Sequence, residues 1–88
     1  MSRRQKFLAQ LLSGQHDQTL DFSALCLLLE TLGFEQRVRG SHHLFGKAGI
    51  DELINIQPAI GNAVKPYQAK QVRAILLKYD SALKLDTI

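Results

Sequence analysis

The sequence predicts an α+β domain in which a three-stranded antiparallel sheet packs on helices, in the order α-α-β-β-β-α. Two observations predict this class. Apolar residues recur at helical spacing near both ends of the chain, whereas in the middle they alternate with polar residues between glycine-containing turns. The chain has 88 residues, 45% of them hydrophobic, which suffices for one modest core. We therefore expect residues 1–88 to form a single domain.

The N-terminal segment is predicted to be an amphipathic helix. Residues 3–13 place apolar side chains on one face, and Gly14 stands where a C-terminal cap is expected. A polar loop follows this helix. Residues 1–20 are thus predicted to be a helical extension of a core formed by residues 21–80.

The second helix is predicted from its capping residues. Asp21 has the character of an N-cap, and Leu20 and Leu25 occupy the positions of a hydrophobic staple around it. Gly33 is expected to end the helix. Its middle contains the only cysteine, Cys26, which lies among leucines and is predicted to serve packing.

Three short strands are predicted next. Uncharged and charged residues alternate along residues 34–39, which predicts the first strand. Residues 42–45 are predicted to form a second short strand, and residues 50–57 a third. The glycine-containing segments 40–41 and 46–49 connect them as turns. Consecutive strands joined by short turns predict an antiparallel meander with one face on the helices and the other face open.

The last helix is predicted to begin at Pro66, because proline is favoured in a first helical turn. We expect Lys70 and Arg73 to face solvent. Apolar spacing predicts one long helix with these core-facing residues: Val72, Ile75, Leu76, Tyr79 and Leu83.

Charge and cysteine content restrict the function classes. The formal net charge is +3, and between residues 36 and 79 seven Lys and Arg face two Asp and Glu. This excess suits a phosphate-bearing partner, although a solvated basic surface would look the same. One cysteine allows no intramolecular disulfide, and no apolar stretch is long enough to span a membrane. We expect a cytoplasmic protein without a membrane partner.

The histidine pair after the first strand is the main candidate for chemistry. His42 and His43 follow Gly40 and Ser41, and adjacent strand residues point to opposite faces of a sheet. Histidine can take or give a proton near neutral pH, as removal of the ribose 2′-hydroxyl proton requires. Judged from these residues alone, ordinary packing and hydrogen bonding explain the pair better than catalysis does.

Residues 25–79 resemble the HicA family of type II toxin-antitoxin systems. The similarity lies in three segments that occur in the family's order: Leu29-Glu30-Thr31-Leu32-Gly33-Phe34, Gly40-Ser41-His42-His43-Leu44-Phe45, and Lys65-Pro66-Tyr67 followed by Val72-Arg73-Ala74-Ile75-Leu76.

The resemblance implies a double-stranded-RNA-binding-like fold and an endoribonuclease that cleaves mRNA, arrests growth and is neutralised by a HicB-type antitoxin. It implies that His42 is catalytic, without a metal or cofactor, and that His43 is structural. We expect a monomer or weak dimer. The predicted RNA-binding residues are Arg37, Arg39, Ser41, Lys47, Lys65 and Lys70. Two alternatives remain: a double-stranded-RNA-binding-like module that does not cut, and a decayed toxin that binds only an antitoxin.

Overall fold

The structure of the protein is a computed structural model that describes residues 2–88. It confirms the α+β class and the predicted order α-α-β-β-β-α. The structure also contains two short helical turns and a fourth helix that were not predicted. The elements are α1 (Arg3–Ser13), α2 (Phe22–Thr31), β1 (Glu35–Arg39), β2 (His42–Lys47), β3 (Ile50–Ile56), η1 (Ile60–Asn62), α3 (Pro66–Lys78), α4 (Asp80–Leu83) and η2 (Leu85–Thr87).

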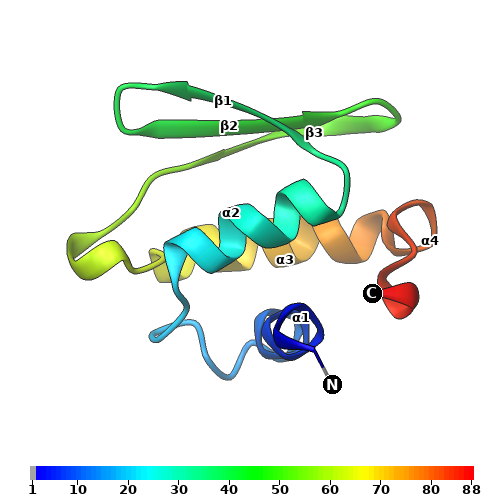
Figure 1. Ribbon diagram of the computed structural model, residues 1–88, viewed down its shortest axis with the longest axis horizontal. Helices are drawn as coiled ribbons and strands as arrows, with labels where there is room; N and C mark the ends of the chain where they lie inside the picture. The colour runs from blue at the N-terminus through cyan, green and yellow to red at the C-terminus, as the bar shows by residue number, and fades with distance from the viewer. Residues whose placement is uncertain (1) are drawn as a thin grey trace.

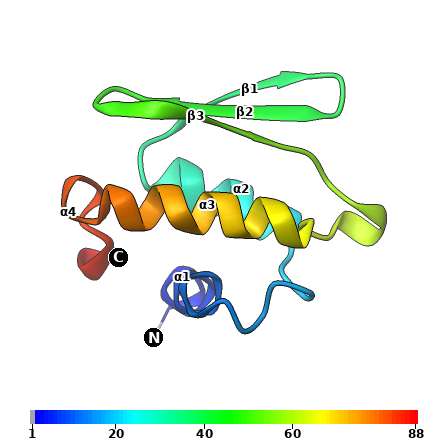
Figure 2. The ribbon, with the colours of Figure 1, turned by 180° about the vertical axis from the view of Figure 1, so that it is seen from behind.

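The elements form three layers. The sheet lies on one side, α2 and α3 lie side by side beneath it, and α1 packs against the far side of these two helices (Figures 1 and 2). Within the described residues 2–88, no helix covers the other face of the sheet. Among residues 2–88, no helix is long and apolar enough to cross a bilayer.

The first hairpin has the register that its turn predicts. Arg39 pairs with His42 across the two-residue turn at 40–41, and Gln36 pairs with Phe45 further along. Gly40 has a φ of +58°, a conformation that a two-residue hairpin turn requires and that glycine adopts without strain. The short turn therefore fixes which side chains lie beside His42.

The second hairpin contains an irregularity that the sequence does not predict. Lys47 pairs with Ile50 across the turn, but Phe45 pairs with Ile54. Three residues of β3 thus lie opposite the single residue Gly46. The register of the remaining strand is shifted by two residues relative to a regular hairpin.

One buried cluster includes both ends of the chain. Leu8 and Leu11 of α1 are buried with the helices of the middle layer, as are Leu83 and Leu85 near the C-terminus. The division into a helical extension and a core of residues 21–80 is therefore not reproduced in the packing. The N-terminal helix is part of the core of the protein.

The predicted long C-terminal helix is interrupted. α3 ends at Tyr79, whose φ and ψ of −110° and 26° lie outside the helical range, and α4 begins directly after it. The break lets the chain turn back toward α1, where the side chain of Gln5 donates a hydrogen bond to the carbonyl of Ile88. Val72 and Leu76 are buried as predicted, whereas Ile75 is only half-buried. We therefore expect replacement of Ile75 to destabilise the fold less than replacement of Leu76.

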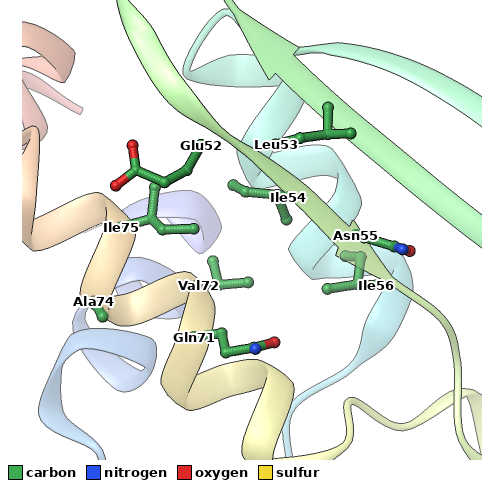
Figure 3. Close-up of a pocket in the computed structure, with 9 residues that line it drawn as sticks. All are labelled: Glu52, Leu53, Ile54, Asn55, Ile56, Gln71, Val72, Ala74 and Ile75. Carbon is green, nitrogen blue, oxygen red and sulfur yellow. The ribbon is translucent and has the colours of Figure 1, made fainter.

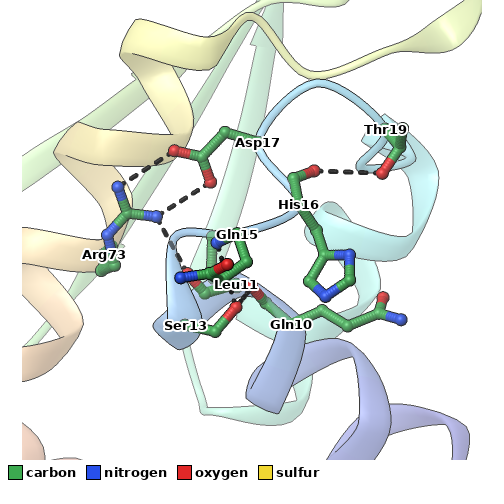
Figure 4. Close-up of polar contacts among 8 residues, drawn as sticks. All are labelled: Gln10, Leu11, Ser13, Gln15, His16, Asp17, Thr19 and Arg73. Carbon is green, nitrogen blue, oxygen red and sulfur yellow. Dashed lines mark hydrogen bonds and ion pairs between the residues drawn. The ribbon is translucent and has the colours of Figure 1, made fainter.

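Arg73 does not face solvent, and the prediction that it does is wrong. Its guanidinium donates two hydrogen bonds to the carboxylate of Asp17, at 2.9 and 3.0 Å, and a third to the carbonyl of Leu11 at 3.0 Å (Figure 4). Asp17 raises the pKa of Arg73. Helical spacing placed Arg73 on the outside of α3, but α1 and the loop after it cover that side. This cluster fastens the N-terminal segment to α3.

We expect Asp17→Ala to lower the free energy of unfolding by about 1–3 kcal/mol, because it leaves a largely covered guanidinium without its carboxylate. Chemical denaturation would measure the loss. Asp86→Ala removes an exposed carboxylate elsewhere and should change stability by less than about 0.5 kcal/mol. Equal effects of the two variants would contradict a fastening role for Asp17.

A second polar cluster ties α3 to β3. The carboxylate of Glu52 accepts hydrogen bonds from Lys78, at 2.8 Å, and from the hydroxyl of Tyr79. These two hydrogen bonds lower the pKa of Glu52 below its ordinary value of 4.5. The ionised carboxylate is thus favoured in the folded protein.

This shift predicts a pH dependence. A carboxylate with a lowered pKa in the folded state stabilises the protein above its ordinary pKa and loses that contribution as the pH falls below 4.5. Glu52→Gln should therefore flatten the acid limb of a plot of stability against pH. Asp51→Asn is the control, because Asp51 forms no ion pair with residues 2–88. An unchanged acid limb in Glu52→Gln would contradict the prediction.

Candidate functional site

The open face of the sheet carries the predicted site. We use this name for the outward-facing side chains of the three strands, which the pairing register places together on the side away from the helices. From the β1–β2 turn to the middle of the sheet its polar members are Arg37, Arg39, His42, Asn55 and, just past β3, Gln57. The exposed carboxylate of Glu35 lies on the same face at the start of β1.

His42 lies exposed on this face, beside its strand partner Arg39. The Nδ1 atom of His42 is 3.1 Å from the side-chain oxygen of Asn55. An amide oxygen can only accept, so Nδ1 carries the hydrogen in this arrangement and Nε2 holds the free lone pair. Arg39 and Arg37 form no ion pair with residues 2–88, which leaves both guanidinium groups available.

Ser41 is held beside His42 by a hydrogen bond that limits its chemistry. Its hydroxyl donates to the side-chain oxygen of Gln57 at 2.9 Å. The single hydroxyl hydrogen is thereby used, and Ser41 can only accept a further hydrogen bond through this group. Its side chain therefore orders the turn at 40–41 and does not donate to a phosphate in this arrangement.

His43 points to the opposite face, toward the helices. Its Nδ1 lies 2.9 Å from the amide oxygen of Gln36, whose nitrogen donates to Glu30 at 3.0 Å. Its ring also meets Phe22 edge to face, with 4.9 Å between the ring centroids. The two histidines cannot act on one atom, and the contacts of His43 are those of a packed residue.

Lys47 lies at the far end of β2. It is five positions along the strand from His42, roughly 17 Å at the usual rise per residue. Its ammonium lies against Gly33, where a Cβ would come within 2.8 Å of it. Lys47 and Arg37 border a hollow of about 590 Å³ on the sheet. Gly46, which has no side chain, also lines this hollow. Lys47 therefore borders this hollow from the edge of the sheet and does not contact the His42 end.

The structure does not bring Lys65 and Lys70 to this face. Lys65 precedes α3 and Lys70 lies within it, and α3 packs on the other side of the sheet. Helical spacing indicates exposure but cannot tell which layer a helix joins. Of the predicted RNA-binding residues, Arg37 and Arg39 share the open face with His42.

Cys26 is half-buried, consistent with its predicted packing role. Burial raises the pKa of its thiol to about 11, and the carboxylates of Glu30 and Asp21 add to the shift. The thiol therefore stays protonated near neutral pH and is a poor nucleophile. Within the described residues, no group of three His, Cys, Asp or Glu side chains is placed to hold a metal ion.

No family model, curated protein or solved structure matches the chain. The resemblance to the HicA family therefore rests on three segments, within residues 29–34, 40–45 and 65–76.

Two residues of this face were not identified from the sequence. Asn55 orients His42, and Gln57 holds Ser41. Alternation in the third strand does place both on the side away from the apolar residues Ile54 and Ile56. Their sequence signal was therefore present, but only the pairing register shows which strand neighbours they meet.

Proposed function

We propose that this chain is a toxin ribonuclease that cleaves mRNA at the open face of its sheet, with His42 as the general base. The observation that carries the proposal is the setting of His42. Its ring is exposed, Asn55 occupies Nδ1, and the unpaired guanidinium of Arg39 lies on the neighbouring strand. A free Nε2 with a permanently charged arginine on the neighbouring strand suits proton removal next to a phosphate.

The proposed reaction uses the ribose 2′-hydroxyl as nucleophile. Nε2 of His42 takes the hydroxyl proton, the 2′-oxygen bonds to phosphorus, and the bond from phosphorus to the 5′-oxygen breaks. The leaving oxygen takes a proton from water, which gives a 2′,3′-cyclic phosphate and a 5′-hydroxyl end. Arg39 and Arg37 hold the phosphate and stabilise the charge that develops on its oxygens.

The wider setting follows from the family resemblance. We propose a double-stranded-RNA-binding-like fold with an added N-terminal helix, a cytoplasmic location, and neutralisation by a HicB-type antitoxin that covers the open face. The succession of α2, three antiparallel strands and α3 around a sheet with one free face supports this proposal.

The decisive experiment combines expression in bacteria with cleavage in the test tube. Induced wild-type protein should arrest growth and shorten the lifetime of a reporter mRNA. The purified protein should cut an RNA strand, leave 2′,3′-cyclic phosphate ends, and fail on a 2′-deoxy strand of the same sequence. If folded protein binds RNA and never cuts it, the proposed activity is wrong and the chain is an RNA-binding module.

Salt dependence tests the role of the arginines. We expect Arg39→Gln to weaken RNA binding and to reduce the slope of log affinity against log salt by about 0.7, the amount for one phosphate of a single strand. Arg4→Gln, on the far side of the molecule in α1, should leave the slope unchanged. Titrations at several salt concentrations would measure both, and equal slopes in the two variants would rule out a phosphate contact by Arg39.

A further inference from the structure

The hollow of about 590 Å³ on the sheet carries charged groups that the proposed reaction does not use. Its charged lining residues are Glu35, Arg37 and Lys47, and none of them forms an ion pair with residues 2–88. The ammonium of Lys47 lies against Gly33, two residues before Glu35 in the chain. A carboxylate and two cations therefore border one hollow without pairing with each other.

The remaining lining of the hollow is apolar or small. Leu44 is half-buried and Leu53 is 60% exposed. Gly46 pairs with Glu35 across the first hairpin, and a Cβ at Gly46 would lie 3.5 Å from the end of the Leu53 side chain. Two small residues complete the lining: Gly33 and Ala48. A flat group can therefore lie against the two leucines while its edge meets the charged side chains.

The hollow between β3 and α3 differs in its charge. It measures about 460 Å³, and within residues 2–88 the one charged residue that lines it is Glu52 (Figure 3). The carboxylate of Glu52 already pairs with Lys78. That hollow offers a ligand no unpaired charge, whereas the hollow beside Glu35 offers both an acceptor and cations.

The position of Glu35 fits an RNA strand that crosses the open face. Glu35 lies four positions from Arg39 along β1, roughly 13 Å, and Arg39 is the strand partner of His42. Arg37 lies between Glu35 and Arg39 on the same face. A strand whose phosphates contact the two arginines therefore brings a neighbouring base to the hollow.

The charges of the hollow match the pairing edge of guanine. An ionised carboxylate only accepts hydrogen bonds, and an ammonium only donates them. Guanine presents two neighbouring donors, N1–H and the N2 amino group, next to the acceptor O6. Adenine and cytosine have an unprotonated ring nitrogen in place of N1–H, and uracil has a single N–H between two carbonyl oxygens. Of the four bases, guanine alone can donate twice to a carboxylate and accept from a cation.

We propose that this hollow binds an unpaired guanine of the RNA and that Glu35 selects it. The carboxylate of Glu35 accepts hydrogen bonds from N1–H and the N2 amino group, and Lys47 donates to O6. The face of the base lies against Leu44 and Leu53, and Arg37 is left to the adjoining phosphate. This inference rests on the proposed binding of RNA by the open face and does not require cleavage.

The test compares the affinities of short oligouridine RNAs that differ in one base. The full chain carries His42→Ala, so that no strand is cut during the measurement. A strand with one guanine should bind about 5- to 150-fold more tightly than the same strand with adenine, the discrimination typical of a bidentate contact to a base. Inosine lacks the N2 amino group and should give an intermediate affinity. Equal affinities for the guanine and adenine strands would overturn the proposal.

Glu35→Gln, added to the same protein, separates base selection from simple charge. Removing a carboxylate from a face that binds phosphates should by itself tighten the binding of every strand. If Glu35 selects guanine, the variant loses affinity for the guanine strand and binds the adenine strand at least as tightly as before. Asp86→Asn removes an exposed carboxylate in η2 and should keep the preference. An equal gain for both strands in Glu35→Gln would show that this carboxylate only repels RNA and would overturn the proposal.

Selection and cleavage can fail separately in these experiments. If the wild-type protein cuts RNA and His42→Ala shows no preference for guanine, the cleavage stands and the guanine site is wrong. If no RNA is cut but a preference for guanine disappears in Glu35→Gln, the guanine site stands and the ribonuclease activity is wrong. Folded protein that binds none of the strands would overturn both.

Discussion

Replacing His42 with alanine is expected to slow RNA cleavage by roughly 10²- to 10⁴-fold, the range typical for loss of a general acid or base. The side chain is exposed and makes one side-chain hydrogen bond, so the fold should remain close to wild type. RNA affinity should also persist, because Arg37 and Arg39 are unchanged. Single-turnover cleavage and RNA binding, measured on the same preparation, would separate the two effects.

The control for this experiment is another exposed histidine. His16 lies in the loop after α1, which is on the side of the helices away from the sheet, and His16→Ala should retain full cleavage activity. Asn55→Ala should have an intermediate effect, because it keeps the His42 ring but removes the contact to its Nδ1. Unchanged cleavage by His42→Ala would show that His42 is not the general base and would leave RNA binding as the function of the face.

Phe45→Ala is expected to destabilise the fold by about 3–5 kcal/mol. Phe45 is fully buried at the centre of β2 and packs between the sheet and the helices. A domain of this size has a total stability of roughly 4–13 kcal/mol, so the variant should be marginally folded or unfolded at room temperature. Urea denaturation followed by circular dichroism would measure the change.

Leu53→Ala provides the comparison on the same sheet. Leu53 is 60% exposed, and its truncation should change the free energy of unfolding by less than about 0.5 kcal/mol. A similar loss in both variants would mean that the two faces of the sheet are buried alike. That result would contradict an open face and, with it, the accessibility of His42.

Local sequence signals determined the elements of this fold and the side of the sheet on which the strand residues lie. Asp21 caps α2 as predicted, its side chain accepting the N–H of Ala24 at 2.9 Å. Alternation placed His42 and His43 on opposite faces. These features depend on interactions within a few residues, so a pattern of capping residues and apolar spacing is enough to predict them.

Tertiary structure decided what lies next to each element. A regular hairpin across residues 48–49 would pair His42 with Asn55, but the irregularity in β3 shifts the register by two and pairs Leu44 with Asn55. Asn55 then reaches His42 from a diagonal position. The irregularity adds two residues to β3, which leaves the two-residue alternation intact, so the sequence pattern does not reveal it.

The same reason explains Arg73, Lys65 and Lys70. Spacing on a helix predicts which residues share a face, and it placed Arg73 and Lys70 outside the core. Whether a face meets solvent, another helix or the substrate depends on how distant segments pack. The sequence by itself determined the α+β order, the caps and the two faces of the sheet. Only the tertiary structure shows that Arg73 pairs with Asp17 and that Lys65 and Lys70 lie away from the face of His42. Both results depend on packing between segments that are far apart in the chain.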